Sequence, residues 1–119
     1  MLVDRKVKNA KKNIISEQIN LGNGRYRDSE VNTLHDIVVN RGEYIGKSKT
    51  VKKSYTGWSS DGKYTRQEET IYSIKGDDSS LYIEEKYHYH DDDGQSDGFE
   101  QNYSTGREIL NLLEKFFNN

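Results

Sequence analysis

Apolar residues near the start of the chain repeat at the spacing of one helical face. Lys and Asn residues occupy most of the positions between them, which is the pattern of an amphipathic helix. The spacing predicts a helix over residues 3 to 19, ended by the glycine-rich segment 21 to 24, whose residue types readily adopt positive φ. The apolar positions, at i, i+4, i+7 and i+11, are Val3, Val7, Ala10 and Ile14.

Residues 29 to 40 are compatible with two structures. Val31, Leu34 and Val38 lie on one helical face. The run from Ile37 to Val39 is also compatible with a strand, because β-branched residues favour extended backbone. We favour a helix, with Gly42 just beyond its end.

Residues 43 to 103 alternate in character and are interrupted by three turn-rich segments, residues 58 to 62, 76 to 79 and 91 to 98. This pattern predicts an antiparallel β-meander of three to four strands. In the third strand, Leu81, Ile83, Tyr87 and Tyr89 share one face, which we expect to lie toward the core.

Turn length and charge together predict the register of the meander. A four-residue loop over residues 59 to 62 would pair Trp58 with Lys63, and this register places Lys52 opposite Glu69 and Lys53 opposite Glu68. A two-residue turn at Asp77 and Asp78 would place Glu69 opposite Lys86 and Tyr72 opposite Ile83. The two registers together predict a row of Lys52, Glu69 and Lys86 across three strands.

The C-terminal segment carries the clearest helical signal. Thr105 and Glu108 match the S/T-x-x-E capping box, in which two side chains satisfy free amides at a helix start. An apolar face follows at i, i+3, i+4 and i+7, formed by Ile109, Leu112, Leu113 and Phe116. We expect this helix to pack on the apolar face of the sheet.

The predicted fold class is α+β: a three- to four-stranded antiparallel meander with an N-terminal amphipathic helix and a C-terminal helix packed on one sheet face. A length of 119 residues predicts a single domain over residues 1 to 119. Hydrophobic residues make up only 31% of the chain, below the usual fraction of about 45%. The core is therefore expected to be thin and to use some of the nine Tyr side chains.

The chain contains no Cys and no Pro. Disulfides and thiolate metal sites are excluded, and a reducing compartment fits best, so we expect a cytoplasmic protein. The sequence has neither the apolar run of a signal peptide nor one of membrane-spanning length, so we expect no membrane association.

Charge is divided along the chain. Residues 1 to 66 hold 14 Lys or Arg against 7 Asp or Glu, whereas residues 67 to 119 hold 4 against 13. The two halves can neutralise each other across the sheet, or the basic half can bind nucleic acid, with Tyr55, Trp58 and Tyr64 as stacking surfaces. The candidate nucleic-acid residues are Arg5, Lys6, Lys8, Lys11, Lys12, Lys47, Lys49, Lys52, Lys53 and Trp58.

A concentrated acidic segment lies at the predicted tip of the last hairpin, with aromatic residues beside it. Carboxylates of this kind can dock on a basic protein surface, and aromatic side chains surrounded by complementary charge are typical of interface hot spots. The candidate partner-binding residues are Asp91, Asp92, Asp93, Asp97, Glu100, Tyr87, Tyr89 and Phe99.

Catalytic and metal chemistry have little support in the sequence. No nucleophile elbow, zinc-protease helix or phosphate-binding loop is present, so we expect a protein that is not an enzyme and has no cofactor. His88 and His90 project from the same face of a strand and are weak candidates for a metal site, because two ligands are too few for one. A metal-dependent enzyme centred on them is the last alternative.

The sequence contains no motif of a known family. Its abundance of Lys, Asn, Asp, Ser and Tyr, without Cys or Pro, is similar to that of small proteins of phages and mobile elements from low-GC bacteria. This composition favours a non-catalytic protein-binding module, such as a defence inhibitor or an immunity protein, that docks on a basic partner through the acidic hairpin tip. Binding to nucleic acid through the basic half is the alternative.

Overall fold

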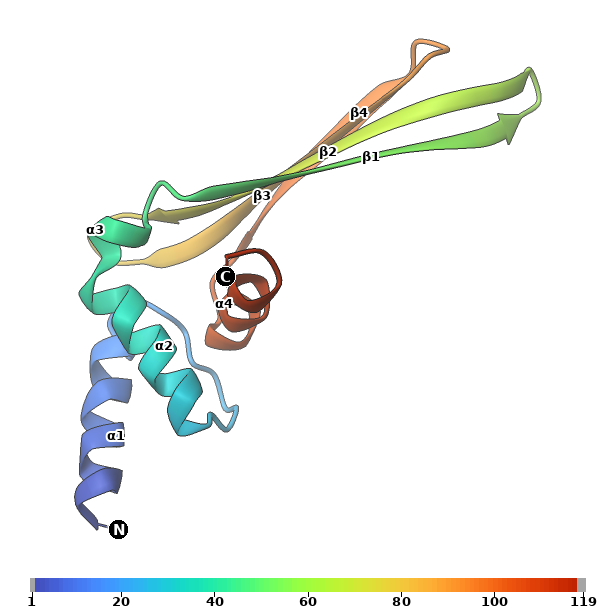
Figure 1. Cartoon of the computed structure of the whole chain (residues 1–119). Helices are drawn as coiled ribbons and strands as arrows, with labels where there is room; N and C mark the ends of the chain where they lie inside the picture. The colour runs from blue at the N-terminus through green and yellow to red at the C-terminus, as the bar shows by residue number, and fades with distance from the viewer. Residues whose placement is uncertain (1, 118–119) are drawn as a thin grey trace.

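The computed structural model describes residues 2 to 117 and confirms the predicted α+β class, with four antiparallel strands in one open sheet and the helices gathered at one end (Figure 1). The remaining residues of the predicted domain, 1, 118 and 119, lie outside the described range. The elements are α1 (Leu2–Ser16), α2 (Asp28–Val39), α3 (Arg41–Tyr44), β1 (Ser48–Ser59), β2 (Gly62–Gly76), β3 (Leu81–Asp91), β4 (Ser96–Tyr103), α4 (Gly106–Leu112) and the π-helical segment η1 (Leu113–Phe117).

The strands follow one another in the order β1-β2-β3-β4, so the predicted meander is confirmed. The register of the first hairpin is also as predicted, with Trp58 opposite Lys63, Lys52 opposite Glu69 and Lys53 opposite Glu68. The predicted four-residue loop is wrong, because Ser59 pairs with Gly62 and the turn has only two residues. Lys52 and Glu69 form an ion pair at 3.8 Å. The alternation of side chains along each strand therefore assigns the two faces of the sheet correctly.

The predicted register of the second hairpin is wrong by two residues. Gly76 pairs with Leu81, which places His88 rather than Lys86 opposite Glu69, and Glu85 rather than Ile83 opposite Tyr72. The turn takes four residues, because the Asp77 carboxylate accepts hydrogen bonds from the amides of both Ser79 and Ser80. A slip of two keeps every side chain on its predicted face.

The segment that was compatible with helix or strand forms α2, as favoured, and buries Val31, Leu34, Ile37 and Val38. Helix α1 ends at Ser16, three residues before the predicted end. The prediction of its buried face is wrong: Val7, Ala10 and Ile14 are exposed, whereas Ile15 and Ile19 are buried. The side chain of Val3 lies outside the described residues.

Lysines occupy the side of α1 that faces α2. Lys8 donates a hydrogen bond to the Tyr26 carbonyl at 2.7 Å and lies 3.1 Å from the Asp28 carboxylate. Lys11 donates to the side chain of Asn32 at 2.9 Å. Long lysine stems can cover apolar surface while their amines find polar partners, which explains why this face rather than the apolar stripe is turned inward.

The C-terminal helix begins and packs as predicted. Thr105 and Glu108 form the capping box, and the Thr105 hydroxyl accepts from the Glu108 amide at 3.3 Å. Ile109 and Leu113 belong to the same buried cluster as Ile83 of β3. The helix therefore covers one face of the sheet, called here the helix-side face; the other is called the far face.

The molecule is elongated, at 67 × 27 × 26 Å. Its radius of gyration is 18.7 Å, compared with about 13.5 Å for a compact domain of this length. The extra length comes from the sheet, whose two hairpin tips extend well beyond the helices (Figure 1). The outer part of the sheet therefore lies beyond α4, and its helix-side face is available for binding.

Candidate functional site

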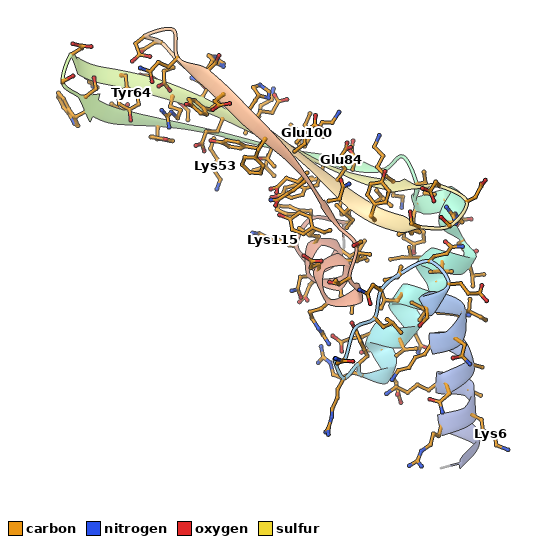
Figure 2. All side chains as sticks on the ribbon, turned by 180° about the vertical axis from the view of Figure 1, so that it is seen from behind. Lys6, Lys53, Tyr64, Glu84, Glu100 and Lys115 are labelled. Carbon is orange, nitrogen blue, oxygen red and sulfur yellow. The ribbon has the colours of Figure 1, made fainter. Side chains whose placement is uncertain are left out.

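Aromatic side chains gather on the helix-side face of the outer sheet. Four strands contribute to this aromatic patch, and the observed registers place its members on the same face. Each ring is half-buried or exposed, with Phe99 49% exposed. Tyr64, near the far end of the sheet in Figure 2, marks the outer limit of the patch. The members are Tyr55, Tyr64, Tyr87, Tyr89 and Phe99.

Arg66 lies among the tyrosines of the patch. Its guanidinium carbon is 4.1 Å from the ring centroid of Tyr89, 5.5 Å from that of Tyr64 and 5.8 Å from that of Tyr55. Such distances allow a cation to be attracted by the face of an aromatic ring. Arg66 therefore links rings from β1, β2 and β3 into one surface.

Asp91 balances the charge of Arg66. The guanidinium donates to both carboxylate oxygens of Asp91, from Nε at 2.6 Å and from Nη2 at 3.0 Å. This pairing lowers the pKa of Asp91 and raises that of Arg66. The Asp91 side chain is only 2% exposed. Asp91 thus stabilises the patch and is not available to a partner, contrary to the role that the sequence suggested.

Tyr87 connects the patch to the neighbouring strands. Its ring stacks on Phe99 with centroids 5.0 Å apart, and its hydroxyl donates to Glu68 Oε1 at 2.9 Å. Desolvation is the largest cause of a raised pKa at Tyr87, and the hydrogen bond to the Glu68 carboxylate is the second. Together they raise the pKa of Tyr87 to about 12. Tyr87 therefore stays neutral at physiological pH and can act as a fixed aromatic wall.

The other acidic candidates separate into two groups. Asp92, Asp93 and Asp97 are exposed at the end of the last hairpin, and Asp97 pairs with Tyr89 in the sheet register. Glu100 projects from the far face, where its carboxylate lies 3.9 Å from the Lys86 amine. Figure 2 shows Glu100 and Glu84 on the side of the sheet opposite Lys115. The structure thus joins Tyr87, Tyr89, Phe99 and Asp97 on one face and separates Glu100 from them.

The basic candidates do not form one surface. Arg5, Lys6, Lys8, Lys11 and Lys12 lie on α1, whereas Lys47 precedes β1 and Lys49, Lys52 and Lys53 lie within it. Figure 2 shows Lys6 and Lys53 in distant parts of the molecule. Lys52 and the 78% exposed Trp58 project from the far face, opposite to Lys49 and Lys53.

His88 and His90 both project from the far face, beside Glu69 and Gln67 of β2. Among the residues that the structure describes, no group of three or more His, Cys, Asp or Glu side chains is arranged to hold a metal ion. In the same part of the chain, no helix is long and apolar enough to cross a membrane.

The sequence predicts Tyr55 and Tyr64 only as stacking surfaces beside the basic residues and gives no role to Arg66. A signal for them was present, because the correctly predicted first hairpin already places Tyr55 opposite Arg66 and Tyr64 opposite Gly57. Comparison with protein-family models, with curated proteins and with solved structures found no match. The candidate site therefore depends on its geometry alone.

Proposed function

We propose that this chain is a non-catalytic protein-binding module that docks on a basic partner through the outer end of its sheet. The observation that supports this proposal is the clustering of five aromatic side chains on the helix-side face of the outer sheet. Aromatic residues are enriched in interface cores, where they supply large contact areas at low conformational-entropy cost. The aromatic patch is the proposed anchor of the interface.

The charged residues beside the patch favour a basic partner. Asp92, Asp93 and Asp97 are exposed at its outer rim, and complementary charge at a rim steers association and selects partners. Arg66 adds no free positive charge, because Asp91 pairs with it. The same carboxylates would repel phosphate groups, so the geometry supports a protein partner over a nucleic acid at this surface. A role as a defence inhibitor or an immunity protein stays a prediction.

Comparative capture with matched variants tests the proposal. The immobilised chain would be incubated with an extract of its source cells, and bound proteins would be quantified by mass spectrometry. The tip variant changes Asp92, Asp93 and Asp97 to Asn. Its control carries Glu84→Gln, Glu100→Gln and Asp78→Asn. The control therefore loses the same number of negative charges, all of them at positions outside the tip. Circular dichroism would verify that each variant is folded.

We expect the wild-type chain and the control to capture a basic protein that the tip variant does not capture. Phe99→Ser should also abolish its capture, whereas Trp58→Ser, which changes an exposed ring on the far face, should not. Equal capture by all variants would overturn the proposal. Retention of nucleic acid that weakens steeply with salt and depends on the lysines of α1 would support the alternative instead.

A further inference from the structure

We propose that β1 binds an extended acidic segment of a partner protein as a fifth strand of the sheet, with one apolar side chain of that segment in a hollow beside β1. This surface adjoins the aromatic patch, with which it shares Tyr87, but it is separate from the acidic tip and has the opposite charge preference. It therefore goes beyond the docking function proposed above.

Strand β1 is a long edge strand. It runs for 12 residues and pairs with β2, and no other described segment pairs with it. The backbone N–H and C=O groups on its outer side are thus free to form a ladder with an added strand. Addition of a peptide strand to such an edge obtains affinity from main-chain hydrogen bonds and specificity from pockets for alternate side chains.

A hollow of about 280 Å³ lies on the helix-side face next to this edge. Val51 and Lys53 of β1 line one side of it, and Lys115 and Phe116 of η1 line another. Tyr72 forms part of its wall and stacks on Phe116, with ring centroids 4.4 Å apart. Val51, Tyr72 and Phe116 give this hollow an apolar lining, which suits an apolar side chain of an added strand.

Two lysines, Lys53 and Lys115, line this hollow, and Lys49 lies farther along the same face of β1. Lys49 and Lys53 project from β1 on the helix-side face, and Figure 2 shows Lys53 and Lys115 on the same side of the sheet. No carboxylate among the described residues forms an ion pair with Lys49, Lys53 or Lys115. Glu68, which also lines the hollow and lies opposite Lys53 in the register, accepts a hydrogen bond from Tyr87. Carboxylates of a partner would find amines here that form no ion pair among the described residues.

The spacing on β1 specifies the sequence of the added segment. Lys49, Val51 and Lys53 alternate along the strand and so share one face. Residues directly opposite each other on paired strands interact, and opposite charges there attract. An acidic-x-apolar-x-acidic segment would thus place carboxylates opposite Lys49 and Lys53 and its apolar side chain opposite Val51.

The same lysines act against self-association. Lysine on an edge strand prevents pairing between two copies, because the like charges would face each other. An acidic segment removes that penalty, whereas a neutral or basic segment does not. Protection of the edge and selection of an acidic partner are therefore compatible roles for Lys49 and Lys53.

A synthetic peptide tests the proposal directly. The probe is a fluorescein-labelled peptide of sequence Ser-Thr-Glu-Thr-Leu-Thr-Glu-Thr-Ser, and the control peptide has Lys in place of both Glu residues. Binding to the full chain is measured by fluorescence anisotropy. The contact residues are located by amide chemical-shift changes and by hydrogen exchange of the β1 amides.

We expect saturable binding of the acidic peptide, no binding of the control peptide, and slower exchange of alternate β1 amides. Changing Lys53 and Lys115 together to Glu should weaken binding by about tenfold or more. Lys52→Glu, on the far face of the same strand, should change the affinity less than twofold, on the order of a surface pair. If the two Glu substitutions disturb the fold beside Glu68, the double variant Lys53→Gln and Lys115→Gln provides the same test.

Absence of saturable binding at millimolar peptide would overturn the proposal. Equal affinity of the wild-type chain and both the Glu and the Gln variants would do the same, as would shift changes confined to the hairpin tips. The tip variant with Asn at positions 92, 93 and 97 should bind the peptide as the wild-type chain does. Failure of the β1 proposal can therefore be distinguished from failure of the tip proposal.

Discussion

Arg66 of β2 holds Asp91 of β3 through two parallel hydrogen bonds, at 2.6 and 3.0 Å. Bidentate pairs of this type combine charge with fixed geometry. The pair joins two neighbouring strands near the outer end of the sheet and fixes the guanidinium against Tyr89. The aromatic patch thus depends on an ion pair that is itself mostly covered.

Asp91→Asn should loosen the pairing of β2 with β3 at the outer end of the sheet. The substitution leaves the half-buried guanidinium of Arg66 without a counter-charge, and an unpaired charge in such a position is destabilising. We expect faster hydrogen exchange of the β3 and β4 amides near the tip and a lower unfolding midpoint in urea. Asp92→Asn, at the adjacent exposed residue, is the control. Unchanged exchange in the Asp91 variant would contradict a structural role for the pair.

Two adjacent isoleucines of α1 should respond very differently to truncation. Ile15 is 0% exposed and Ile14 is 40% exposed. Ile15→Ala should lower the free energy of unfolding by about 2 to 5 kcal/mol, because it leaves a cavity in the core. Ile14→Ala should change it by about 0.5 kcal/mol or less. Urea denaturation of both variants measures the difference, and a larger cost at Ile14 would mean that the apolar stripe of α1 is the packed face.

Thr105→Ala should destabilise the C-terminal helix. The Thr105 hydroxyl accepts from the Glu108 amide, and its loss leaves a helix N–H without a partner. The expected decrease in the free energy of unfolding is about 0.5 to 2 kcal/mol, measured by urea denaturation. Thr105→Ser keeps the hydroxyl and should retain most of the stability. Equal losses in the two variants would assign the effect to packing of the methyl group.

Glu30 should make the fold sensitive to acid. Its carboxylate accepts from an Arg107 guanidinium and, at 2.8 Å, from the Arg27 amide. These bonds lower the pKa of Glu30 from 4.5 to about 2, and the bond from Arg107 contributes most to this change. Because the folded-state pKa is below the unfolded one, the stabilisation is complete above about pH 4.5 and is lost as the pH falls toward about 2.

The matched variant Glu30→Gln isolates this contribution, since other carboxylates of the chain titrate equally in both proteins. Melting temperatures would be measured between pH 6 and pH 2, an interval chosen to span the shift expected from linkage. The wild-type protein should lose more stability than the variant across this interval. Parallel curves for the two proteins would show that Glu30 is not bound by Arg107 in solution.

The sheet shows how far local patterns predict pairing. The first hairpin has a two-residue turn in place of the predicted four-residue loop, but both loops give the same register, so the Lys52 to Glu69 ion pair follows from the sequence. The second hairpin contains two successive Asp and two successive Ser residues, which allow several loop lengths. Hydrogen bonds from Ser79 and Ser80 to the Asp77 carboxylate select the four-residue loop, and a count of turn residues cannot anticipate them.

The candidate site shows the same limit. Alternation along β3 correctly placed Tyr87 and Tyr89 on one face, since side chains two residues apart on a strand always share a face. It could not show that Asp91 is covered while Asp92 and Asp93 are exposed. That difference depends on Arg66, which is 25 residues away in the sequence and comes into reach only through the pairing of β2 with β3.

Local sequence patterns were enough to predict the α+β class, a meander of three to four strands with its faces, and the capped C-terminal helix, because these depend on neighbours within about one helical turn or one strand pair. Packing between distant segments sets which side of α1 is buried and which acidic side chains remain free. Both outcomes depend on the surface that packs against a residue, such as α2 against Ile15 or Arg66 against Asp91. A periodic pattern identifies an apolar stripe, but burial requires an opposing surface, and chain topology decides where that surface lies.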